Sequence, residues 1–194
     1  MLEIVIVGVG GQGTLLASRI LGALAIDRNM DVKVSEVHGM SQRGGSVITH
    51  VRIGTNGETV YSPLVEDGGA DFVLSFEALE AYRAARYLKA GGMIVTGDQQ
   101  ILPMPVITGA AKYPADALGK AGEMAKVLSL DALKIAEECG SVRSANVVLI
   151  GSMARYLPFT KEEVRKAVAL CVPPKTVDVN LAAFEKGYEL GAAL

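Results

Sequence analysis

A glycine-rich loop near the amino terminus constrains the fold more than any other feature of the sequence. An apolar run at residues 2–7 leads into GVGGQG at residues 8–13, and residues 14–27 then carry apolar side chains at helical spacing. A strand, a glycine loop and a helix in this order open a βαβ unit. The first glycine permits a tight turn, the second lets a phosphate approach the backbone, and the third lets helix and strand pack closely.

The α/β pattern recurs along the chain. Strands are predicted at residues 32–37, 71–75, 93–96, 106–107 and 125–130, and helices at residues 77–88, 133–139, 145–156, 160–170 and 179–194. The strand at 32–37 is almost continuously apolar, which favours a parallel strand buried on both faces. Gly187 and Gly191 in the last helix let another backbone come close, which favours packing onto the sheet. The pattern predicts an α/β fold: a Rossmann-like, mostly parallel sheet with helices on both faces.

A hairpin is expected to interrupt the parallel pattern. Residues 47–53 alternate in polarity, and residues 58–61 follow Asn56-Gly57. Asn-Gly between β-prone runs favours a type I′ turn, because both central residues of that turn need a positive φ. We therefore expect an antiparallel hairpin insertion at the edge of the sheet. Two prolines keep residues 101–105 extended or looped.

Length and composition indicate one domain over residues 1–194, with no repeat and no linker. Nineteen basic and 21 acidic residues give a net charge of -2, which offers no general attraction for nucleic acid. The amino terminus lacks the basic segment of a signal peptide, and no apolar run approaches the roughly 18–20 residues of a membrane span. We expect a cytoplasmic protein that binds neither nucleic acid nor membrane.

Cysteine and histidine are too sparse for a metal centre. Cys139 and Cys171 are the only cysteines, too few for a zinc cage or an iron–sulfur cluster. Of the two histidines, His50 lies in an alternating strand and His38 has no second ligand nearby at metal-binding spacing. The chain also has no G-x-S-x-G serine motif and no lysine-bearing phosphate loop, which leaves hydrolase and NTPase functions without support.

The loop at residues 8–13 is a candidate phosphate site. Backbone amides at the start of the following helix favour an anion, and Glu36 stands where a ribose-binding carboxylate is expected. The alternative is that these glycines only make a tight turn and that Glu36 is a solvated residue at the end of a strand.

A second polar, glycine-bearing loop follows the next predicted strand, at residues 38–46. Its Arg43 can present a fixed fork to a phosphate or carboxylate, and Ser41, Gln42 and the amides near Gly44 can add donors. The alternative is a loop shaped for subunit contact, with Arg43 paired to a partner's carboxylate. Spacing alone slightly favours the subunit contact.

The two loops together resemble those of one enzyme family. VGVGGQG at 7–13, EVHGMSQRGGSV at 36–47 and HVRIG at 50–54 look like the small subunit of 2-oxoacid:ferredoxin oxidoreductases, of the indolepyruvate type. The resemblance continues through residues 61–63, 69–71, 77–92 and 180–188, and so covers nearly the whole chain. Gamma subunits of pyruvate oxidoreductases share the first motif but usually have an ERRGA-like run where SQRGG stands here.

The resemblance implies a division of labour. Such complexes oxidatively decarboxylate a 2-oxo acid, here an aryl pyruvate, to an acyl-CoA and reduce ferredoxin. Thiamine diphosphate and the iron–sulfur clusters belong to a larger partner subunit, so a hetero-oligomer is expected, with no cofactor held by this chain alone and no activity in isolation. Coenzyme A is the ligand expected at the two loops. The candidate contacts are Gly8, Gly10, Gly11, Gln12, Gly13, Ser41, Gln42, Arg43 and Gly44, and no residue is assigned a catalytic or metal-binding role.

Two further hypotheses remain open at this point. A stand-alone oxidoreductase that binds NAD(P) or a flavin predicts dinucleotide binding by the isolated chain, weakened by Glu36→Ala. A purely structural scaffold predicts that both glycine loops tolerate substitutions that block a phosphate.

Overall fold

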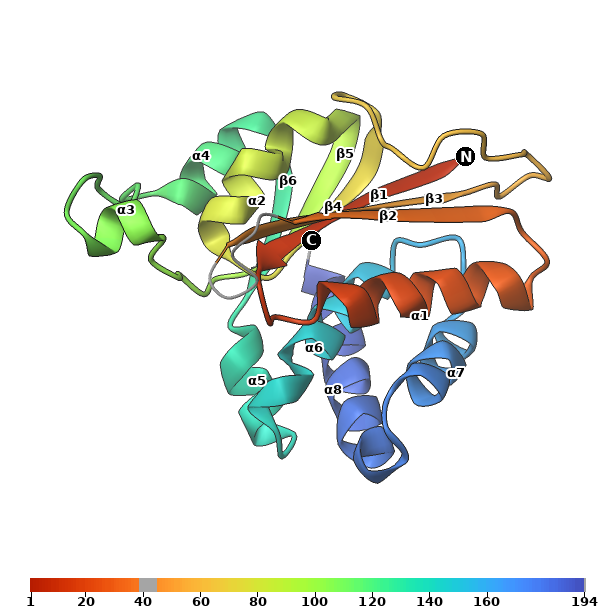
Figure 1. Ribbon diagram of the computed structural model, residues 1–194. Coiled ribbons are helices and arrows are strands. Elements are labelled where there is room, and N and C mark those ends of the chain that lie inside the picture. Colours follow the sequence, from red (N-terminus) through yellow and green to blue (C-terminus); the bar gives the residue numbers. More distant parts are fainter. Residues whose placement is uncertain (39–44, 194) are drawn as a thin grey trace.

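A six-stranded sheet lies between two layers of helices (Figure 1). The computed structural model describes residues 1–38 and 45–193. The strands are β1 Leu2–Val9, β2 Val32–His38, β3 Ser46–Ile53, β4 Ala70–Ser75, β5 Leu88–Gly97 and β6 Lys126–Leu130. The α-helices are α1 Thr14–Asp27, α2 Ala78–Ala84, α3 Met104–Ile107, α4 Ala117–Met124, α5 Ala132–Glu138, α6 Ala145–Ala154, α7 Lys161–Cys171 and α8 Val177–Leu190. None of the helices in these ranges is long and apolar enough to cross a membrane.

The strand order is β2-β3-β1-β4-β5-β6. The pairs β1–β4, β4–β5 and β5–β6 are parallel, whereas β3 is antiparallel to both of its neighbours. Only β3 runs against the other strands, which confirms a mostly parallel sheet. Helices α2 and α4 cover one face, and α1 and α5 to α8 form the layer on the other face (Figure 1).

The second strand does not have the predicted surroundings. β2 is the edge strand and pairs only with β3, in antiparallel register, with Val37 opposite Ile48. Its residues are half-buried or exposed, and Val37 is 54% exposed. The prediction of a strand buried on both faces was wrong, because β3 is inserted between β1 and β2 and leaves β2 at the edge.

The antiparallel ribbon contains the strand predicted at residues 47–53, but this strand has a different partner from the one predicted. β2 and β3 pair with each other, while residues 58–61 form no strand. Gly57 takes a positive φ of 75°, but Asn56 does not have a positive φ, so the predicted type I′ turn is not formed. The amide of Val60 donates to Asp31 Oδ2 at 2.7 Å, and the Val60 side chain is fully buried. These interactions hold the segment against the body of the protein instead of in a hairpin with β3.

The region after β5 also differs from the prediction. Residues 106–107 belong to the single helical turn α3, not to a strand, and the amides of Val106 and Ile107 both donate to the carbonyl of Pro103. No residue of α3 is buried. Helix α4 was not predicted, and β5 begins at Leu88, before the glycines that were expected to precede it. The prolines therefore break the pattern as predicted but are followed by a helical turn, whereas Gly91 and Gly92, which were predicted to end a helix, lie inside β5.

Helices α6 and α8 touch through their backbones. A Cβ at Gly187 would lie only 2.8 Å from the carbonyl carbon of Val148, and a Cβ at Gly151 would lie 3.1 Å from that of Phe184. Glycine on both helices therefore permits this close approach. The predicted approach of another backbone is confirmed at Gly187, but its partner is α6, which itself packs against β4 and β5.

The sequence Thr160-Lys161-Glu162-Glu163 predicts a capping box, which is present at the start of α7 and is linked to α1. Thr160 Oγ1 accepts from the amide of Glu163, whose carboxylate accepts from the amide of Thr160. Arg28, at the end of α1, donates to both oxygens of that carboxylate at 2.7 Å. These hydrogen bonds lower the pKa of Glu163 from its ordinary 4.5 to about 2, and the hydrogen bond from Arg28 has the largest effect.

This link predicts an acid-dependent loss of stability. Because the folded pKa of Glu163 lies below the unfolded value, its contribution is complete above about pH 4.5 and is lost as the pH falls toward 2. We expect Glu163→Gln to be less stable than the parent at pH 7, with the difference shrinking over that window. Chemical denaturation at a series of pH values measures this difference in the free energy of unfolding. A difference that stays constant down to pH 2 contradicts the link.

Candidate functional site

The carboxyl ends of β1 and β4 mark the place where the sheet changes its winding direction. The chain leaves β1 through α1 on one face and reaches β2, whereas it leaves β4 through α2 on the other face and reaches β5 (Figure 1). β1 and β4 are parallel neighbours, so both ends lie at the same edge. Open α/β sheets bind ligands in the crevice at such a switch point.

A cavity of about 400 Å³ opens beside this point, on the face that carries α5 and α6. Its lining comes from the glycine loop (Gly11–Gly13), the carboxyl end of β5, and the starts of α5 and α6. Phe76, Leu133 and Leu149 provide apolar wall. This volume lies within the range of small-molecule sites.

Gln12 ties three strand ends together beneath the cavity. Its Oε1 accepts from the amide of Val9 at 2.7 Å, while its Nε2 donates to the carbonyl of Phe76 at 2.9 Å and to Oε1 of Gln99 at 3.1 Å. Both donor hydrogens and the carbonyl of this side chain thus have partners within the protein. Gln12 lines the cavity but acts as a brace between the ends of β1, β4 and β5.

Gly13 brings α1 close to α6. It has a φ of 93°, and a Cβ here would overlap Nδ2 of Asn146 and lie 3.2 Å from Cγ of that side chain. Only glycine satisfies both conditions without strain. The third glycine of the motif therefore admits a polar side chain from α6 next to the start of α1.

The predicted contact residues divide into three groups. Gly11, Gln12 and Gly13 line the cavity, and the amides of Gly11 and Gly13 have no acceptor among the residues that the structure describes. Gly8 and Gly10 do not line it, and the amide of Gly10 donates to the carbonyl of Gly45 at 2.9 Å. This bond brings the end of the second loop against the first. Ser41, Gln42, Arg43 and Gly44 lie outside the described residues.

Glu36 does not reach the cavity. It lies on β2, two strands away from β1, and its Oε2 accepts from the hydroxyls of Thr14 at 3.4 Å and Thr49 at 3.1 Å. A ribose-binding carboxylate needs to face the nucleotide beside the glycine loop. The arrangement therefore gives the dinucleotide hypothesis no support from Glu36.

Four polar residues of the cavity were missed by sequence reasoning. Asp98 and Gln99 follow β5, Arg143 lies in the turn before α6, and Asn146 lies in the first turn of α6. Burial, together with the nearby Asp131 carboxylate, raises the pKa of Asp98. The position of Asp98 after a predicted parallel strand was an available signal, whereas nothing in the local sequence distinguishes Arg143 or Asn146.

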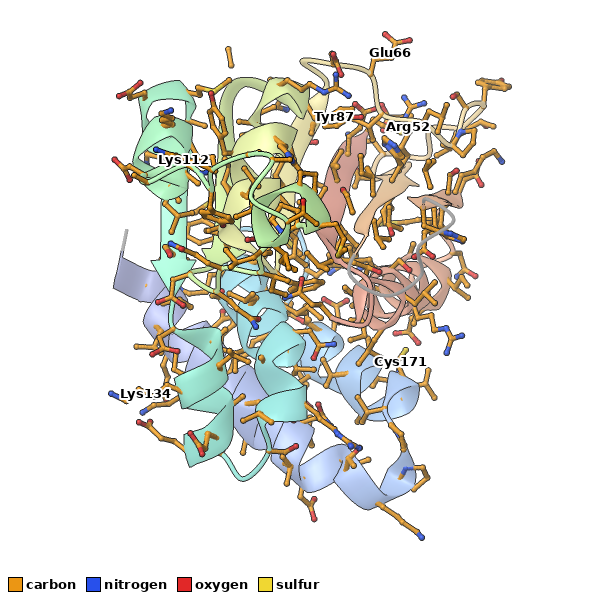
Figure 2. All side chains as sticks on the ribbon, turned by 60° about the vertical axis from the view of Figure 1, so that its left-hand side comes forward. Arg52, Glu66, Tyr87, Lys112, Lys134 and Cys171 are labelled. Carbon is orange, nitrogen blue, oxygen red and sulfur yellow. The ribbon has the colours of Figure 1, made fainter. Side chains whose placement is uncertain are left out.

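The described residues do not fit an iron–sulfur cluster. They contain no group of three or more histidine, cysteine or acidic side chains placed to hold a metal. Cys139 directly follows α5, whereas Cys171 (Figure 2) ends α7, and both are free thiols. A cluster held by thiolates needs several of them converging on one point.

Comparison with known proteins identifies the family. The model of the pyruvate ferredoxin/flavodoxin oxidoreductase family matches residues 3–190. Indolepyruvate oxidoreductase subunit IorB of Thermococcus kodakarensis is 46% identical over 193 residues, covering 96% of this chain and 94% of that one. The IorB subunit of Archaeoglobus fulgidus is 41% identical over 192 residues, with the same shares covered.

A solved structure has the same fold. The gamma subunit of a keto/oxoacid ferredoxin oxidoreductase from Geobacter sulfurreducens superimposes with a TM-score of 0.72 at 25% identity, and the match covers 100% of both chains. The family match spans nearly every element of the sheet and both helical layers. The chain therefore belongs to the pyruvate ferredoxin/flavodoxin oxidoreductase family.

Proposed function

We propose that this chain is the small subunit of a 2-oxoacid:ferredoxin oxidoreductase that acts on indolepyruvate or a related aryl pyruvate. The observation that carries the proposal is the 46% identity to subunit IorB, which extends over 96% of this chain and 94% of the relative. In the proposed reaction, the 2-oxo acid and coenzyme A yield an acyl-CoA and carbon dioxide, and the released electrons reduce ferredoxin.

The chemistry in this proposal is divided between subunits. A larger partner in the cytoplasmic complex carries thiamine diphosphate and the iron–sulfur clusters and passes electrons to ferredoxin. The scarcity of thiols supports this division, because two cysteines on separate helices cannot ligate a cluster. The contribution of this chain is then to shape the complex and to bind substrate groups at the cavity beside the glycine loop.

Coenzyme A is the proposed ligand of that cavity. The free amides of Gly11 and Gly13 and the start of α1 suit a phosphate, and Arg43 from the second loop is proposed to reach the same group. The bond between Gly10 and Gly45 supports this pairing, since it holds the end of the second loop beside the first.

Reconstitution with the large subunit tests the function. We expect the purified complex to reduce ferredoxin with indolepyruvate only when coenzyme A is present, and each subunit alone to be inactive. Arg43→Ala in the assembled complex is expected to raise the KM for coenzyme A about tenfold, the loss of one charge-assisted contact. A complex that assembles but turns over no 2-oxo acid refutes the function. Unchanged binding and KM for coenzyme A in the Arg43 variant refute the proposed contact.

A further inference from the structure

We propose that Asn146 and Arg143 form, with the first turn of α1, the subsite that holds a phosphoryl group of a nucleotide-type ligand in the cavity. The inference rests on the proposed function for its natural ligand, coenzyme A, and deepens it by naming the recognising side chains. Sequence motifs pointed only to the two loops at residues 8–13 and 38–46. The structure adds a second wall, built from the start of α6.

Asn146 is buried yet keeps an unused donor. Its residue is only 7% exposed, and its Oδ1 accepts from the amide of Val147 at 2.9 Å. That bond fixes the orientation of the amide, so Nδ2 faces Gly13 and the cavity. No described residue accepts a hydrogen bond from Nδ2. Although the residue as a whole is buried, Nδ2 itself is open to the cavity, where an acceptor on the ligand can reach it.

The start of α1 adds further donors at the same place. The amides of Leu16 and Ala17 are the first to bond back, to the carbonyl of Gly13, so those of Thr14 and Leu15 have no partner within the helix. No side chain of the described residues caps this terminus, and its first turn contains no acidic residue. In the part of the chain that the structure describes, the one carboxylate that contacts this turn is Glu36, which accepts from the Thr14 hydroxyl at 3.4 Å and does not line the cavity. The partial positive charge of the 14-residue helix is therefore available on the cavity side, near Nδ2 of Asn146.

Arg143 supplies a full positive charge to this subsite. It lies in the turn that leads into α6 and lines the cavity, and no described residue forms an ion pair with it. The guanidinium of Arg143 and Nδ2 of Asn146 belong to residues that line the same cavity, and together they suit a phosphoryl group, which accepts from both.

The acidic part of the cavity restricts the class of ligand. Asp98 lines the cavity after the carboxyl end of β5, and together with the nearby Asp131 it places negative charge there, so a second anion is disfavoured. A carboxylate can accept instead from hydroxyl or amino groups. Phe76, Leu133 and Leu149 offer apolar surface in the same cavity. A phosphoryl group joined to a sugar and a base can contact the Asn146 and Arg143 donors, the acidic residues and the apolar surface. Inorganic phosphate can contact only the donors.

Two variants of the reconstituted complex test the subsite. Asn146→Asp keeps an oxygen for the amide of Val147 but replaces the donor with a negative charge, and Arg143→Ala removes the cation. We expect the KM and the calorimetric Kd for coenzyme A to rise about tenfold in Arg143→Ala and more in Asn146→Asp, with the KM for the 2-oxo acid unchanged. Lys134→Ala is the control, because this lysine of α5 points away from the neighbouring helices (Figure 2) and is not part of the cavity.

Two competing ligands and a binding measurement test the subsite independently of the proposed function. Adenosine 3′,5′-bisphosphate is expected to compete with coenzyme A in the parent complex, and inorganic phosphate to compete far more weakly. Calorimetric binding of coenzyme A does not require turnover, so it tests the subsite even in a complex that turns over no 2-oxo acid. Equal Kd values for the parent, both variants and Lys134→Ala overturn the inference, even if the parent is fully active.

Discussion

Replacing Gly187 with alanine is expected to lower the free energy of unfolding by about 3 kcal/mol or more. The added Cβ would lie 2.8 Å from the carbonyl carbon of Val148 and 3.0 Å from its Cα, so backbone, not a flexible side chain, stands in its way. Helices α6 and α8 must separate to accept it, and overpacking of a rigid interface costs in the range of large single-site effects. Denaturant unfolding followed by circular dichroism measures the change.

Gly22→Ala provides the matched control for this prediction. Gly22 lies within α1, and a Cβ there would meet no atom within 4 Å. Alanine is the better helix former, so this variant is expected to gain about 0.5–1 kcal/mol. If both substitutions change stability in the same direction and by similar amounts, helix propensity decides the outcome and the close backbone contact is unimportant.

Glu77→Ala is expected to destabilise the protein by about 3–5 kcal/mol, because it leaves one buried and two half-buried donors without their acceptor. The Glu77 residue is 1% exposed. Its Oε2 accepts from the amide of Glu80 at 2.8 Å, and its Oε1 accepts from the amide of Ile101 at 3.0 Å and from the hydroxyl of Tyr113 at 2.6 Å. Burial, together with the Glu77 hydrogen bond, raises the pKa of Tyr113, so the phenol stays a donor.

Two measurements separate the anchoring of residues 101–113 by Glu77 from a general effect of removing a charge. Limited proteolysis of Glu77→Ala is expected to cut within residues 101–113, which the carboxylate holds at both ends. Tyr113→Phe removes one of the bonds and is expected to cost about 1–2 kcal/mol, less than the Glu77 variant. Glu123→Ala, an exposed carboxylate on α4, is the control and is expected to stay within about 0.5 kcal/mol of the parent. Equal proteolysis in the Glu77 and Glu123 variants argues against the anchoring role.

The sequence predicted those parts of the fold that depend on local chemistry. The run from β1 through the glycine loop into α1 is specified by residues next to one another, and so is the capping box of Thr160 and Glu163. The position of a strand within the sheet is not specified by neighbouring residues. Val32–His38 reads as a buried parallel strand from its valines, but the pairing of β1 with β3 decides that it lies at the edge.

The same division applies to the candidate site. The motif at 8–13 indicated the cavity, and three of its predicted contacts line it. Sequence reasoning treated Gln12 as a ligand contact, whereas its side-chain donors and acceptor bind Val9, Phe76 and Gln99. Asn146 was out of reach because its importance depends on its approach to Gly13, from a helix far along the chain.

The backbone contact between α6 and α8 has a consequence for how the sequence can diverge among relatives. Asn146 stands in the first turn of α6, while the middle of the same helix is held against α8 through Gly151 and Gly187. A larger residue at either glycine would push α6 and carry Asn146 away from the glycine loop, although neither position touches a ligand. Natural selection for the asparagine should therefore also act on those two glycines, so that all three positions change together or not at all as relatives diverge.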